Sequence, residues 1–118
     1  MELLRIYTDE GEVVVTQISK PRTYEAMMIL KPNLTDEEVE ESIQKYTNMI
    51  QEAGGEIINL ENWGKRRLAY EMDKEREGIY IIINFKVKPE HVDSINKSMR
   101  LDPKVHRHMI VRVNKNED

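Results

Sequence analysis

Apolar residues recur at helical spacing in two segments of the chain. In the first segment, five of them follow one another at intervals of four, three, four and three residues, which places them on one face of a helix. They are Val39, Ile43, Tyr46, Ile50 and Ala53. Thr35 and Glu38 stand where a capping box begins a helix, and the glycines at 54 and 55 would end it. The second segment starts at Pro89, a residue suited to the first turn of a helix, and its buried positions are Val92, Ile95 and Met99.

Four other segments have the alternation or the apolar runs of β-strands. They are residues 22–31, 56–70, 78–85 and 105–113. The five large residues 79–83 predict a central strand, and the mostly charged residues 71–77 before it predict an exposed loop. Gly64, within the second segment, predicts a bulge or a close approach of backbone. In the last segment, alternation places Val105, Arg107, Met109, Val111 and Val113 on one face, and His106, His108, Ile110 and Arg112 on the other.

The order strand, helix, strand, strand, helix, strand predicts an α+β fold. Two split βαβ units with right-handed crossovers give a four-stranded antiparallel sheet with both helices on one face, the ferredoxin-like βαββαβ arrangement. This domain is expected to span residues 21–114, followed by a polar tail at 115–118. Residues 1–20 form an N-terminal extension with two short apolar runs around a glycine, which predicts either a hairpin or a tail that orders only on a partner.

Charge is segregated along the chain, although the net charge of −4 gives no general sign of nucleic-acid binding. Residues 35–53 carry six acidic residues and one lysine, whereas residues 104–115 carry four cations and no acid. The chain has no cysteine, which excludes disulfides and thiol chemistry. No apolar run approaches the roughly 20 residues that cross a bilayer, and neither a signal peptide nor a transit peptide is expected.

Catalysis and metal binding have little support in the sequence. His106 and His108 alternate on one strand, but neither a third ligand nor a cysteine lies near them, so no metal site is predicted. The loop after the first strand, residues 31–34, lacks the glycine and arginine of a phosphate-cradling loop, and no Gly-rich phosphate loop occurs elsewhere. We therefore expect a protein without enzymatic activity, cofactor or small-molecule substrate.

The densest positive charge lies in residues 63–70, Trp-Gly-Lys-Arg-Arg-Leu-Ala-Tyr, which also hold the single tryptophan. Three consecutive cations indicate an anionic partner, of which phosphate is the foremost, or else an exposed strand edge that resists aggregation. An RNA recognition motif would have the same topology, but aliphatic residues stand at 79 and 81 in place of stacking aromatics. Base reading on the open sheet face is therefore not expected, and that apolar face is expected to pack against a protein or an additional segment of chain.

Several segments, in matching order and spacing, resemble the bacterial and organellar small-subunit ribosomal protein S6 family. They are Gly-Lys-Arg-Arg-Leu-Ala-Tyr at 64–70, Arg-Thr-Tyr-Glu at 22–25, Ile-Leu-Lys-Pro-Asn-Leu at 29–34, Gly-Ile-Tyr at 78–80 and Val-His-Arg-His-Met at 105–109. The resemblance covers roughly residues 22–114. The two histidines of the last segment stand where many relatives have arginine or an aliphatic residue, and the N-terminal extension is a second departure.

The resemblance implies a non-catalytic constituent of the small ribosomal subunit. It would bind the central domain of 16S rRNA as a heterodimer with ribosomal protein S18, in the ribosomes of the cytoplasm or of a plastid stroma. The candidate RNA-binding residues are Arg22, Tyr24, Lys65, Arg66, Arg67, Tyr70, Arg107, His108 and Arg112. Tyr24 and Tyr70 could equally be core residues, and Arg66 and Arg67 are expected on opposite faces of their strand, with Lys65 beside Arg67.

The alternative is a ferredoxin-like protein-interaction or small-molecule regulatory domain that self-associates through its apolar sheet face. Co-sedimentation with small subunits would favour the ribosomal interpretation, whereas a homo-oligomer without ribosomes would favour the regulatory domain. A sequence-specific binder of single-stranded RNA is a third interpretation, weakened by the missing aromatic residues.

Overall fold

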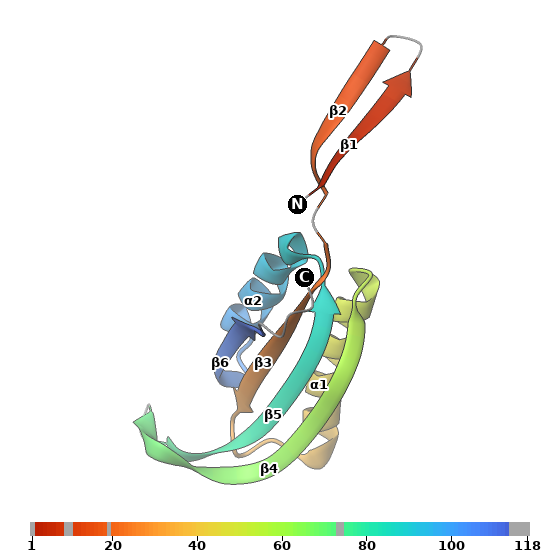
Figure 1. The fold of residues 1–118 in the computed structure, drawn as a ribbon. Helices are drawn as coiled ribbons and strands as arrows, with labels where there is room; N and C mark the ends of the chain where they lie inside the picture. Colours follow the sequence, from red (N-terminus) through yellow and green to blue (C-terminus); the bar gives the residue numbers. More distant parts are fainter. Residues whose placement is uncertain (1, 9–10, 19, 73–74, 114–118) are drawn as a thin grey trace.

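The computed structural model describes residues 2–8, 11–18, 20–72 and 75–113, and side chains for residues 20–67 and 77–113. Six elements in the order βαββαβ form its domain. They are β3 (Arg22–Leu30), α1 (Asp36–Glu52), β4 (Glu56–Met72), β5 (Glu75–Val87), α2 (Val92–Leu101) and β6 (Val105–Arg112). The strands form an antiparallel sheet in the order β4-β5-β3-β6, and both helices lie against one face of it (Figure 1). The predicted ferredoxin-like arrangement is confirmed.

Helix α1 begins at the predicted capping box. The Glu38 N–H donates to Thr35 Oγ1 at 3.1 Å, and the Thr35 N–H donates to Glu38 Oε1 at 2.9 Å. These two bonds satisfy backbone donors that the first helical turn leaves without partners. A one-turn 3₁₀ helix, Pro89–His91, precedes α2, so the predicted proline start is also confirmed.

The core fills the space between the helices and one face of the sheet. Alternate residues of the central strands point into it, and the helices contribute the predicted stripes. The buried residues from the strands are Tyr24, Ala26, Met28, Leu30, Ile79, Ile81, Ile83, Phe85 and Val87, and those from the helices are Val39, Ile43, Tyr46, Ile50, Ile95 and Met99. The two helices are therefore held on the sheet by a single continuous hydrophobic cluster.

A buried polar cluster joins the two helices at the end of α2. The Tyr46 hydroxyl donates to Asp102 Oδ2 at 2.6 Å, and the Lys45 ammonium lies 3.2 Å from the same oxygen. The Lys104 N–H donates to Asp102 Oδ1 at 2.9 Å. The carboxylate of Asp102 is thus buried but well supplied with donors, as a buried charge must be.

The sheet face opposite the helices, called the open face below, is bare of helix throughout the described chain (Figure 1). It is formed by alternate residues of the strands: Glu25, Met27 and Ile29 of β3, Tyr80, Ile82 and Asn84 of β5, and Arg107, Met109 and Val111 of β6. Ile29 and Ile82 are buried by their neighbours, whereas Met109 and Val111 on the edge strand β6 are exposed.

Two predictions about the strands were wrong. The charged residues 71–77 were expected to form a loop, but β4 extends to Met72 and β5 begins at Glu75, because the two strands continue pairing as one long hairpin. Val105 was expected on the face of Arg107. The register instead pairs Ile29 with Arg107 and Leu30 with Val105, so a bulge at His106 turns Val105 towards the core.

The N-terminal extension contains two antiparallel strands, β1 (Glu2–Thr8) and β2 (Gly11–Ile18). Figure 1 shows this hairpin beyond the end of the four-stranded sheet, where it is a separate two-stranded sheet. The polar tail expected at 115–118 lies outside the described residues.

Candidate nucleic-acid interface

A β-bulge in β4 puts Trp63 on the open face. The register pairs Asn62 with Ile81 and Gly64 with Tyr80, so Trp63 is the extra residue of the bulge and has no pairing partner in β5. Gly64 has a φ of 74°, a conformation that glycine adopts without steric cost. The Gly64 N–H donates to Asn62 Oδ1 at 2.9 Å, which fixes the turn of the backbone. The predicted bulge at Gly64 is confirmed.

The indole of Trp63 is held in a fixed orientation by its neighbours. Its ring stacks on Tyr80, with centroids 6.3 Å apart and planes only 7° from parallel. Its Nε1–H donates to Glu61 Oε1 at 2.9 Å, and the other oxygen of Glu61 accepts from Asn59 Nδ2 at 3.1 Å. Trp63 nevertheless remains 45% exposed, so one aromatic surface is offered to solvent in a defined position.

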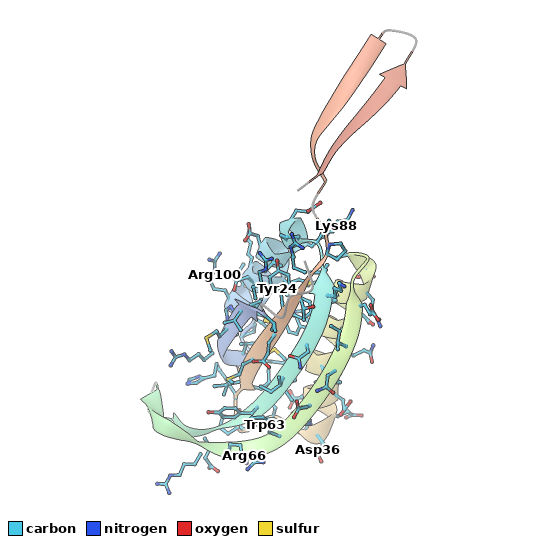
Figure 2. The ribbon with its side chains drawn as sticks, viewed as in Figure 1. Tyr24, Asp36, Trp63, Arg66, Lys88 and Arg100 are labelled. Atoms are coloured by element: carbon cyan, nitrogen blue, oxygen red, sulfur yellow. The ribbon has the colours of Figure 1, made fainter. Side chains whose placement is uncertain are left out.

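Arginines border this aromatic pair. Arg66 Nε–H donates to the Trp63 carbonyl at 3.0 Å, which draws the guanidinium over the bulge. Trp63, Arg66, Arg67 and Tyr80 together line an open recess, called the aromatic recess below. Figure 2 shows Trp63 and Arg66 side by side where the β4–β5 hairpin bends away from the helices.

The strand alternation does not separate Arg66 from Arg67 here. By register Arg66 lies opposite Gly78 and Arg67 opposite Glu77, yet both side chains reach the aromatic recess. Bulges increase the local twist of a strand, so neighbouring side chains are no longer held on opposite faces. Lys65 directly precedes the two arginines in sequence and is exposed.

Arg107 lies in the same row of the open face as the aromatic pair. The register runs from Arg107 to Ile29, from Ile29 to Tyr80, and from Tyr80 to Gly64. Two strand spacings of about 4.8 Å separate Arg107 from Tyr80. Arg22 and Arg112 lie at the opposite end of the sheet, where Arg22 pairs with Val87 and Arg112 with Tyr24.

Of the two candidate tyrosines, Tyr24 belongs to the helix side of the sheet. Tyr24 is only 8% exposed and stacks on Phe85 with centroids 5.7 Å apart, so its ring is a core residue and not a surface for a base. Burial raises the pKa of the Tyr24 hydroxyl, although Arg112 and Arg22 act in the opposite direction. For Tyr70, only the backbone in β4 is described, and its side chain lies outside the described residues.

His108 joins β6 to α2. Its Nε2 lies 2.8 Å from Asn96 Oδ1, and because a carbonyl oxygen only accepts, the neutral ring carries its proton on Nε2. Burial, followed by the nearby Arg100, lowers the pKa of His108. The side chain is therefore an uncharged packing residue at neutral pH, and a contact between it and a phosphate would lack electrostatic support.

The acidic residues of α1 lie on the other side of the molecule from the aromatic recess. Asp36, Glu37, Glu40 and Glu41 are exposed on this helix, which covers the face of the sheet opposite the open face (Figure 1). An anionic partner on the open face would therefore meet the arginines without facing this cluster. Among the described residues, no group of His, Asp and Glu could hold a metal ion, and no helix is long and apolar enough to cross a membrane.

Sequence reasoning did not anticipate the aromatic recess as a unit. Trp63 was noted only as the single tryptophan of the cationic stretch, and Tyr80 only as part of a central strand; the bulge and the β4–β5 register bring the two together. Asn62 and Gly64 flank Trp63, and an Asn-x-Gly sequence inside a strand was the signal that could have indicated the exposed bulge.

Comparison with known proteins identifies the relatives of this chain. The sequence model of the family described as "Ribosomal protein S6" matches residues 23–112. The "Small ribosomal subunit protein bS6" of Carboxydothermus hydrogenoformans is 43% identical over 94 residues, which are 80% of this chain and 98% of the relative. The protein of the same name from Synechococcus sp. is 46% identical over 94 residues, which are 80% of this chain and 69% of that one.

The fold has a counterpart among crystal structures. 30S ribosomal protein S6 from Thermotoga maritima superposes with a TM-score of 0.76 at 33% sequence identity, covering 80% of this chain and 89% of that one. The matched family region contains β4, β5, β6 and all of β3 except Arg22, and therefore the whole aromatic recess. Residues 1–22 lie outside it.

Proposed function

Since the chain belongs to the ribosomal protein S6 family, we propose that it binds the central domain of 16S rRNA together with ribosomal protein S18, as a structural constituent of the small subunit. The family match over residues 23–112 is the observation that carries the proposal. Members of this family are named as ribosomal proteins, so the expectation of a non-enzymatic protein is confirmed. Within the cell, the proposed location is the ribosome.

The RNA contact is proposed for the β4–β5 hairpin. Lys65, Arg66 and Arg67 are all exposed, and arginine offers a planar fork of donors that suits phosphate oxygens. Arg107, in the same row of the open face, extends this cationic border across the sheet. Arg22 and Arg112, at the far end of the sheet, are candidates for a second phosphate contact.

The partner protein is proposed for the apolar part of the open face. Met109 is 54% exposed beside the exposed Val111, and Met27 is their neighbour on β3. Exposed apolar side chains grouped on one sheet face are typical of a protein contact. A basic partner would also explain how a chain with a net charge of −4 contributes to an RNA-binding assembly, because the pair would carry the positive field.

Binding of a central-domain RNA fragment, measured with and without S18, tests this proposal. The expected result is tight binding by the pair and much weaker binding by the isolated chain. Equal affinity of the isolated chain and the pair would contradict the role assigned to S18. A chain that forms a homo-oligomer and does not co-sediment with small subunits would instead support the self-associating regulatory domain.

The N-terminal extension is proposed to add a contact that the Carboxydothermus relative lacks. In the Carboxydothermus relative, 94 aligned residues make up 98% of the protein, so it has no segment comparable to residues 1–20. Strands β1 and β2 form a separate two-stranded sheet, and an isolated hairpin is at best marginally stable in water. Deletion of residues 1–20 is expected to leave the cooperative unfolding of the domain 21–114 unchanged, and loss of that transition would contradict the proposed boundary.

A further inference from the structure

We propose that the aromatic recess receives one unpaired nucleotide of the RNA, with the base stacked on Trp63 and its phosphate held by Arg66 and Arg67. This inference rests on the proposed function and specifies how the RNA is held. It assigns roles to Trp63 as the stacking platform, and to Glu61 and Asn62 as positioning residues.

The recess is built before any RNA arrives. The indole is fixed through its ring face by Tyr80, through its Nε1–H by Glu61, and through the backbone by the Asn62–Gly64 turn. Asn59 in turn holds the carboxylate of Glu61. Five residues thus support a side chain that is itself largely exposed. A platform with fixed orientation loses little entropy when a base stacks on it, which strengthens binding.

The chemistry of the recess selects an unpaired base. A flat aromatic surface bordered by two guanidinium groups matches a nucleotide, which has a π-face and a phosphate at its two ends. Bases inside an RNA duplex are stacked on one another, and the deep major groove of A-form RNA keeps side chains away from them. The ligand is therefore a loop, bulge or single-stranded nucleotide and not a helical segment.

The recess is expected to stack bases without reading their identity. The Trp63 Nε1–H already donates to Glu61, and the Arg66 Nε–H already donates to the Trp63 carbonyl. These two donors are therefore not available for the edge of a base. Stacking accepts any base because every base has a π-face, so purine and pyrimidine strands should both bind.

Trp63 is the only tryptophan, and this makes its fluorescence a direct readout of stacking. The chain is titrated with short oligouridine, oligoadenine and an RNA duplex of matched length, and the signal of Trp63→Leu is subtracted. The two single strands are expected to quench the fluorescence, whereas the duplex is expected to leave it unchanged. Equal quenching by the duplex, or no quenching by either single strand, would overturn the inference.

Variants extend the test to binding of the central-domain RNA by the chain together with S18. Trp63→Leu should weaken binding by roughly 5- to 100-fold, the range for losing one base–aromatic stack. Glu61→Ala should weaken it less, and Glu61→Gln should restore it because the amide oxygen still accepts from the indole. Leu101→Ala, which truncates an exposed apolar residue of α2, is the matched control and should have no effect.

The two proposals fail in different ways. If the wild-type pair binds the central-domain RNA and Trp63→Leu binds it equally well, the recess inference is overturned and the proposed function stands. If the wild-type pair does not bind this RNA, the proposed function is overturned, whatever the variants do. Circular dichroism of Trp63→Leu confirms that a loss of binding does not arise from unfolding.

Discussion

Replacement of Tyr46 by phenylalanine should destabilise the domain although it removes a single oxygen atom. Tyr46 is fully buried, and its hydroxyl donates to the carboxylate of Asp102 at 2.6 Å. In the variant, Asp102 remains buried and keeps only the Lys104 N–H at 2.9 Å and the half-exposed Lys45 at 3.2 Å. A hydrogen bond to a charged group contributes about 1.5–3 kcal/mol, so the free energy of unfolding should fall by about 2 kcal/mol.

Urea unfolding measures this loss, and the chain offers a matched control. Tyr24 is also a core tyrosine, but its hydroxyl bonds to no side chain or backbone group that the structure describes. Tyr24→Phe should therefore change the free energy of unfolding by less than about 0.5 kcal/mol. Equal losses in the two variants would show that the Tyr46–Asp102 bond contributes nothing particular to stability.

The pH dependence of the loss gives a second, independent check. Burial alone would raise the pKa of Asp102, but the hydrogen bonds from Tyr46, the Lys104 N–H and Lys45 outweigh it, so the folded-state pKa is lowered. A lowered pKa stabilises the fold above the unfolded-state value near 3.8, and this stability is lost as the pH falls through the folded-state value. The difference between wild type and Tyr46→Phe should therefore shrink on acidification from pH 7 towards pH 3; a constant difference would refute the reasoning.

Three further variants test other parts of the structure. The pKa of His108 is lowered in the folded state, so the free energy of unfolding should fall as the pH drops below about 6.5. Urea unfolding of His108→Gln should show a smaller fall, and an equal dependence of stability on pH in the two proteins would contradict this. Gly64→Ala should lower the free energy of unfolding by about 1 kcal/mol, because alanine is strained at a φ of 74° even though its Cβ would meet open space. Thermal unfolding should show a smaller loss of stability for Gly64→Asn, because asparagine adopts this conformation more readily. Met109→Asp should weaken S18 binding, measured by calorimetry, at least about tenfold, while its free energy of unfolding changes by less than about 1 kcal/mol. The control Leu101→Asp, at a 66%-exposed residue of α2, should bind S18 normally.

The fold followed from the sequence because its signals were local. The capping box of Thr35 and Glu38, the stripe of α1 and the isoleucine-rich β5 each depend on neighbouring residues, and each was found where the pattern predicted it. The family resemblance added the RNA and the partner protein, which no local pattern supplies. The family itself is confirmed by the match over residues 23–112.

The site was less predictable because it depends on register. Alternation alone cannot show that His106 is an extra residue in β6, and it therefore assigned Val105 to the wrong face. The bulge at Trp63 likewise changes which residues of β4 meet, so that Arg66 and Arg67 reach one recess with Tyr80 from another strand. Tyr24 and His108 were candidates by residue type, but burial on the helix side gives them structural roles.

The most direct test of the central claim is the salt dependence of RNA binding by the chain together with S18. The double variant Arg66→Ala, Arg67→Ala is compared with Lys97→Ala, Arg100→Ala, which removes the same charge from exposed positions of α2. If the recess arginines contact phosphates, their variant should bind more weakly, and its plot of log affinity against log salt should be shallower by about 1 to 2 units. The α2 variant should match the wild type. An unchanged affinity and slope in the recess variant, with S18 still bound, would contradict the assignment of the β4–β5 hairpin to RNA.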